Sequence, residues 1–137
     1  MTWRFVPQKW LYRVQLATLM ATALVGLSIA VTPRERNVST LSVIEEAMSA
    51  DFWAVSMIVL SLVALVAEID MKRHHHERWV MVVAYCHILL CSLLVGYSVA
   101  AMVGVLVRIW WNFGAPTMGM LLAYWHFVFS NRRSTHA

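Results

Sequence analysis

Three ionisable side chains, Glu68, His87 and His126, lie inside stretches of sequence that are otherwise almost entirely apolar. Burying such groups among apolar neighbours is costly unless they pair with one another or with other polar groups. A carboxylate and two imidazoles can hold or pass a proton near neutral pH, and both are ligand types that transition metals accept. What they do depends on whether the fold brings them together.

Three interpretations of these residues remain open. The simplest is a cluster of hydrogen-bonded polar side chains that fixes how the helices pack. The second is a proton or ion pathway, and the third is a pair of histidines that bind a metal or haem. No HExxH or CxxC spacing supports a metal site. We therefore expect no metal, no cofactor and no catalytic residue.

The composition shows which medium surrounds these residues. Of the 137 residues 61% are apolar and only 13% are charged, and the mean hydropathy is +0.66. An ordinary soluble domain carries about a quarter charged residues. The sequence therefore predicts an integral membrane protein without a soluble catalytic domain, which argues against an enzyme. The net charge of +4 does not form a basic stripe, so we expect no nucleic-acid partner.

Four apolar segments are long enough to suggest membrane spans, at about 10–31, 52–69, 79–107 and 115–130. A helix needs about 20 apolar residues to cross a bilayer. We therefore predict a single all-α transmembrane domain, an antiparallel bundle of four helices. Asp51 is the predicted N-cap of the second span. Within residues 32–51, a capping box from Ser42 to Glu45 suggests a short amphipathic helix at the membrane surface, with an ordinary linker as the alternative.

Basic residues predict the orientation of this bundle, because cytoplasmic loops are enriched in Lys and Arg. With both termini in the cytoplasm, eight of the basic residues lie inside and three outside. The inside set is Arg4, Lys9, Arg13, Lys72, Arg73, Arg78, Arg132 and Arg133, and the outside set is Arg34, Arg36 and Arg108. The sequence thus predicts a multi-pass protein of the cytoplasmic membrane with both ends inside.

With these boundaries, the ionisable residues share the cytoplasmic leaflet. Glu68, His126 and His87 lie about 6, 9 and 12 Å inside the boundary at the rise of an α-helix, and Tyr124 lies near the same depth. We therefore predict one buried polar cluster of Glu68, His87, His126 and Tyr124. His87 is roughly opposite Gly96 on its helix, so we expect the two to meet different neighbours.

Small residues recur every fourth position in two spans, a spacing that lets helix backbones approach closely in lipid. These predicted packing faces are Thr18, Thr22, Gly26 and Ala30 in the first span and Ser92, Gly96, Ala100 and Gly104 in the third. Whether they pack within one chain or join separate chains stays open.

In layout the sequence resembles phage holins, small multi-span proteins with a basic amino terminus and a charged tail, here Arg132-Arg133. The resemblance covers the whole chain but no specific motif. It implies a protein that accumulates in the cytoplasmic membrane, self-associates and opens lesions that permeabilise it. Two alternatives are an accessory subunit that docks on a larger membrane complex, and a small redox protein with haem held by His87 and His126.

Overall fold

The computed structural model describes residues 8–31, 48–74, 79–108 and 114–134, and nearly all of these residues are helical. The four helices are α1 (Gln8–Val31), α3 (Ala50–His74), α4 (Trp79–Arg108) and α5 (Gly114–Ser134). The all-α prediction is confirmed for this part of the chain, and each predicted span lies inside one helix. The predicted amphipathic surface helix falls on residues outside the described ranges.

Three of these helices are long and apolar enough to cross a membrane. The stretches that qualify are Lys9–Val31 in α1, Ala50–Arg73 in α3 and Trp79–Val103 in α4. Large apolar side chains such as Leu24, Val66 and Phe127 also lie exposed on the outside of the helices. A surface of this kind is unfavourable in water and suited to lipid, so the chain is a membrane protein by length, composition and surface.

The start of α3 differs from the sequence-based expectation. The hydroxyl oxygen of Ser49 accepts a hydrogen bond from the amide of Phe52 (3.2 Å), and the Ser49 carbonyl accepts one from the amide of Trp53 (3.3 Å). Ser49 is therefore the N-cap. The prediction for Asp51 is wrong in position, because this carboxylate lies in the first turn, where it still faces the positive end of the helix dipole.

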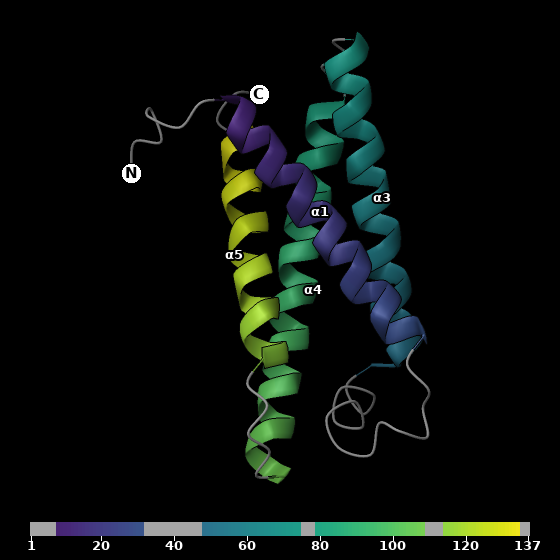
Figure 1. The fold of residues 1–137 in the computed structure, drawn as a ribbon, viewed down its shortest axis with the longest axis vertical. Helices are drawn as coiled ribbons and strands as arrows, with labels where there is room; N and C mark the ends of the chain where they lie inside the picture. The colour runs from purple at the N-terminus through teal and green to yellow at the C-terminus, as the bar shows by residue number, and fades with distance from the viewer. Residues whose placement is uncertain (1–7, 32–47, 75–78, 109–113, 135–137) are drawn as a thin grey trace.

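The helices form two closely packed pairs, α1 with α3 and α4 with α5. Helix α3 also packs on α4, whereas α1 crosses obliquely and touches α5 over a smaller region (Figure 1). We call the interface between the two pairs the seam. Its polar part consists of Gln15, Thr22 and Glu68 on one side and of His87 and His126 on the other. In Figure 1 the first residues of α1 and the last residues of α5 lie at the same end of the molecule.

Glycine allows close approach within each pair. A Cβ atom on Gly26 of α1 would lie 2.9 Å from the carbonyl oxygen of Ala54 and 3.0 Å from the Cβ of Met57, both in α3. A Cβ on Gly119 of α5 would overlap the hydroxyl of Ser98 in α4. These two positions fix how tightly each pair can close, as expected where dispersion contacts drive helix association in lipid.

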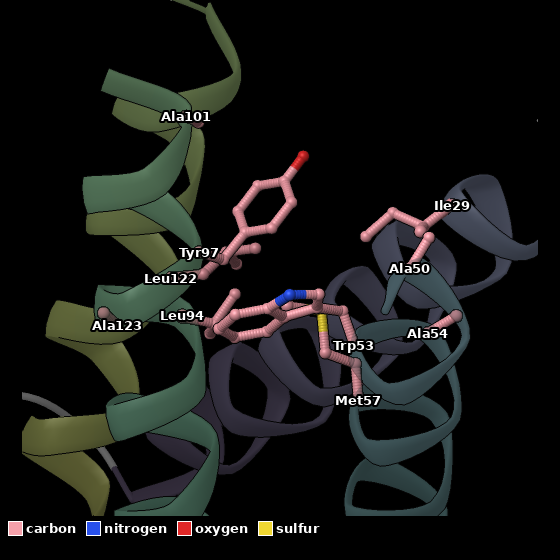
Figure 2. Packing of buried hydrophobic residues seen from close by; sticks show 10 residues of the cluster. All are labelled: Ile29, Ala50, Trp53, Ala54, Met57, Leu94, Tyr97, Ala101, Leu122 and Ala123. Carbon is pink, nitrogen blue, oxygen red and sulfur yellow. The ribbon is translucent and has the colours of Figure 1, made fainter. Parts of the chain in front are cut away.

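An apolar cluster fills the seam at the end opposite the first residues of α1 and the last residues of α5. Trp53 reaches from α3 toward α4, where its ring meets Gly96 and packs edge-on against Tyr97 with the ring centroids 6.2 Å apart (Figure 2). Leu94 of α4 and Leu122 of α5 complete the contact. A second apolar cluster, Leu19, Ala64, Cys86 and Leu90, joins α1, α3 and α4. The remaining part of the seam is polar.

Candidate functional site

The polar part of the seam brings together all three ionisable residues singled out in the sequence. Glu68 is 2% exposed, and His87 and His126 are fully buried. They come from α3, α4 and α5, and α1 supplies Gln15 and Thr22, which are also buried. Every helix of the structure therefore contributes a polar side chain to one site.

Gln15 connects the carboxylate to the first histidine. Its side-chain nitrogen Nε2 donates to Oε1 of Glu68 (2.5 Å) and lies 3.0 Å from Nε2 of His87. The first contact lies within the α1·α3 pair, and the second crosses the seam. One amide nitrogen thus serves an acidic and a basic group at once, using both of its hydrogens.

The two histidines continue the chain of contacts. Nδ1 of His87 lies 2.7 Å from Nδ1 of His126, and Nε2 of His126 lies 2.9 Å from the hydroxyl of Thr22. The Thr22 hydroxyl in turn donates to the carbonyl of Thr18 (2.9 Å). The result is a continuous row of hydrogen-bonding groups from Glu68 to the backbone of α1.

This row has one consistent direction when both histidines are neutral. If Gln15 donates to Nε2 of His87, then His87 carries its hydrogen on Nδ1 and donates it to Nδ1 of His126. His126 then carries its hydrogen on Nε2 and donates to Thr22. Tautomers are assigned in this way from the partners around each ring. Every ring nitrogen is satisfied, so the site can be buried without a charge on either imidazole.

Helix geometry explains why these side chains meet. Gln15, Thr18 and Thr22 are three and four residues apart, so they lie on one face of α1. Long side chains bridge the seam here, because α1 and α4 make no close backbone contact within the described residues. Phe129 of α5 packs on the His87 ring with centroids 5.6 Å apart and closes the site on one side.

The prediction for Tyr124 is wrong. Tyr124 is 51% exposed, its ring packs against Trp125, and it lies outside the cluster. Depth along α5 places it beside His126, but two residues along a helix correspond to a rotation of about 200°. When His126 faces the seam, Tyr124 must therefore face outward.

Some residues of the predicted packing faces are buried between helices, and others are exposed on the outer surface. Thr18, Thr22 and Gly26 are buried, Gly96 meets Trp53, and Ala100 packs partly against the apolar cluster. Ala30 and Ser92 are exposed. The surroundings of Gly104 lie outside the part of the chain that the structure describes. As expected, His87 and Gly96 meet different neighbours, since His87 faces Gln15 and His126.

Gln15 is the member of the site that sequence reasoning missed. The signal was present, because Gln15 is the most polar residue within the apolar run 14–31 and shares a helix face with Thr18 and Thr22. Gln15 was not predicted because only ionisable residues were considered as members of the cluster. A neutral amide is nevertheless well suited to linking a carboxylate to an imidazole.

The site does not fit haem or a metal in this arrangement. Haem bound by both histidines would require an iron and its macrocycle between the rings, where the two Nδ1 atoms are in direct hydrogen-bonding contact. The remaining nitrogens face Gln15 and Thr22. Among the described residues there is no group of three or more His, Cys, Asp or Glu side chains placed to hold a metal ion.

Known proteins give no guide to the function of this chain, so its function is inferred from the geometry of the site. No protein-family model, no curated protein and no solved structure matches the chain.

Proposed function

We propose that all four helices cross the cytoplasmic membrane as an antiparallel bundle with both chain ends in the cytoplasm. The part of α5 before its polar end, residues 114–130, is about 25 Å long at the rise of an α-helix, so it crosses a hydrocarbon core of about 30 Å only if both ends of the helix lie at the interfaces. Its lower hydropathy comes partly from His126, which is buried and so does not face lipid, and partly from Asn131, Arg132 and Arg133 at its end. The excess of basic residues in the proposed cytoplasmic segments supports the same orientation.

Within that membrane, we propose that the protein self-associates and permeabilises the bilayer, as holins do. The observation that carries the proposal is the position of the polar side chains. They lie at the seam between two helix pairs, where a change in packing would turn them from the chain interior toward water. Each pair keeps its own polar bond when separated, Gln15 to Glu68 in one and His87 to His126 in the other.

The polar contacts across the seam are few and individually weak. Two described hydrogen bonds cross the seam, Gln15 to His87 and Thr22 to His126. Side-chain hydrogen bonds within membranes contribute on average about 0.6 kcal/mol each. These two bonds together therefore contribute about 1 kcal/mol to closing the seam, in addition to the apolar contacts that Trp53 makes with Gly96 and Tyr97. Pairs from neighbouring copies could then exchange partners and surround a polar opening.

A second candidate is an accessory subunit that docks on a larger membrane complex. The observation in its favour is the exposure of Ser92 on α4, a small residue flanked on the outer surface by Ile88 and Leu89. A small residue on a lipid-facing surface provides room for another helix to approach. This candidate predicts a chain that accumulates without loss of membrane potential and co-purifies with other subunits.

Induced expression with continuous recording of membrane potential separates the two candidates. The permeabilising role predicts an abrupt loss of potential once the protein has accumulated. The double variant Gln15→Leu and Thr22→Val should accumulate equally but delay or abolish that loss, because it removes the polar groups that α1 brings to the seam. Ser92→Ala is the matched control outside the seam and should behave as the unmodified protein.

Quiet accumulation of the unmodified protein in the membrane, with the potential intact, would refute the permeabilising role. A loss of potential that the seam variant reproduces in full would refute the role given to the polar side chains.

A further inference from the structure

A group of exposed basic side chains lies at one end of the α1·α3 pair, just beyond the polar seam. Lys9 and Arg13 belong to α1, Lys72 and Arg73 lie near the end of α3, and all four are exposed. We call these four residues the basic end. Lys72 follows Glu68 by one turn of α3, about 6 Å further along the helix. In Figure 1 the start of α1 and the end of α3 lie at the same end of the molecule.

Two of these cations lie over aromatic rings. The amino group of Lys72 in α3 lies over the ring of Tyr12 in α1, 4.4 Å from its centroid. The guanidinium of Arg13 lies 5.6 Å from the centroid of the Trp10 ring, on the same helix. Within the described residues no ion pair joins Arg13 or Lys72 to a carboxylate. The rings hold both cations in place by cation–π attraction, and their positive charges are not neutralised there.

The cations of α1 lack a source of negative charge in their own helix. The first turn of α1 holds no acidic residue, and Lys9 lies there at the positive end of the helix dipole, where a cation is disfavoured. Lys9 and Arg13 are also four residues apart, a spacing at which like charges on a helix repel. Of the nearby carboxylates, Glu68 accepts from Gln15 inside the seam, and Asp70 has a contact of its own. An anion from outside the chain would relieve this repulsion.

The aromatic residues place the basic end at the level of lipid headgroups. Trp10 is 59% exposed and Tyr12 is half-buried. The amphipathic rings of Trp and Tyr prefer the boundary between hydrocarbon and water. Long Lys and Arg side chains near helix ends extend to the same boundary, where the phosphates of phospholipids lie. Arg binds a phosphate through two parallel hydrogen bonds, and Lys binds it as a point charge.

We propose that the basic end is a binding site for anionic phospholipids, whose headgroup phosphates are held by Arg13 and Lys72. Phosphatidylglycerol suits such a site because no cation within its headgroup balances the phosphate. Phosphatidylcholine carries a quaternary ammonium beside its phosphate and has no net charge to contribute. The proposal requires only that the chain lies in a membrane. It does not depend on the permeabilising role or on the side of the membrane that the basic end faces.

Lipid titration of the full chain in mild detergent tests the proposal. Binding is measured as the rise in unfolding temperature, because a ligand that binds the folded chain stabilises it. We expect phosphatidylglycerol to raise the unfolding temperature more than phosphatidylcholine at the same concentration. The difference should shrink in about 1 M salt, where the screening length falls to about 3 Å. Native mass spectrometry at low salt should show phosphatidylglycerol bound to the intact chain.

Arg13→Gln, Lys72→Gln and Arg108→Gln form a matched set, since each removes one positive charge. The first two should each weaken phosphatidylglycerol binding about fivefold, because a basic residue near anionic headgroups contributes about 1 kcal/mol. Arg108 ends α4 at the opposite end of the molecule, so its variant should bind nearly as the unmodified chain does. Arg13→Lys keeps the charge and should retain more binding than Arg13→Gln. Circular dichroism confirms that the variants retain their helices before they are compared.

Three results would overturn the proposal. Equal stabilisation by phosphatidylglycerol and phosphatidylcholine would refute a site for anionic lipid and favour an acidic segment of a partner protein as the occupant. Equal weakening by Arg13→Gln, Lys72→Gln and Arg108→Gln would mean that lipid responds only to the net charge of the chain. Equal stabilisation by glycerol phosphate, which has the phosphate but no acyl chains, would mean that the basic end binds free phosphates and not lipid.

Discussion

His87 and His126 are joined directly through their Nδ1 atoms, 2.7 Å apart, although they lie on different helices and 39 residues apart in the chain. A hydrogen bond between two like atoms requires one to carry the hydrogen and the other to accept it. The pair is therefore asymmetric, and the contacts with Gln15 and Thr22 determine which ring plays which part.

Thr22→Val should lower the free energy of unfolding by about 1–2 kcal/mol, because it leaves the buried Nε2–H of His126 without an acceptor. Valine keeps nearly the same shape, so little packing is lost. Unfolding by SDS titration from mild-detergent micelles, followed by circular dichroism, measures the change. Tyr124→Phe removes a hydroxyl from the exposed face of the same region and should have little effect. Equal losses in both variants would contradict the site.

Ser61→Ala should leave stability unchanged or raise it by up to about 1 kcal/mol. The Ser61 hydroxyl is buried in α3 and finds no hydrogen-bond partner among the described residues. Removing a polar group that is already unsatisfied relieves a desolvation cost. The same SDS titration measures it, and a clear loss of stability would mean that this hydroxyl has a partner.

Gly26→Ala should destabilise the α1·α3 pair more than Gly96→Ala destabilises the contact of α4 with α3. At Gly26 the added methyl group would lie 2.9 Å from a backbone oxygen, which cannot move without shifting the helix. At Gly96 it would lie 3.1 Å from the tip of the Trp53 ring, which has some freedom to turn. Overpacking of this kind costs about 1–3 kcal/mol. Thermal unfolding in detergent compares the two variants, and the reverse order would contradict the observed packing.

Gly119→Ala should destabilise the α4·α5 pair, and Ser98→Ala should restore most of the loss in the double variant. The added methyl group overlaps the Ser98 hydroxyl, whereas the Ser98 Cβ lies at an ordinary 3.5 Å. Ser98→Ala by itself removes only a bond to the carbonyl of Leu94 in its own helix. A double-mutant cycle on unfolding free energies measures the coupling, and additive losses would argue against direct contact between the two positions.

Reporter fusions should place both chain ends in the cytoplasm. Four crossings return the C-terminus to the side of the N-terminus, whereas three crossings, with α5 outside the membrane, would leave the ends on opposite sides. A paired alkaline phosphatase and fluorescent-protein fusion after Ala137 reports the side of the C-terminus, and the same pair fused before Met1 reports the other end. Ends on opposite sides would remove α5 from the proposed set of spans.

The apolar pattern of the sequence predicts where the helices lie and that lipid is the medium that suits them. Each predicted span falls inside one helix, because a continuous run of apolar residues has few alternatives to a helix once it leaves water. It also indicated that Glu68, His87 and His126 lie at similar depths, since depth follows from position along a helix of fixed rise. What it missed within the described residues is the rotation of each helix.

The packing of the folded chain shows which helix faces meet, and the sequence does not. It placed His126 inside and Tyr124 outside, brought Gln15 to Glu68 and His87, and left Ser92 exposed while Gly96 meets Trp53. In a soluble helix the polar face reveals the rotation, because it must point to water. In lipid both the outer and the inner faces are apolar, so rotation is set by close packing and a few hydrogen bonds between distant segments. Those contacts exist only once the helices have assembled.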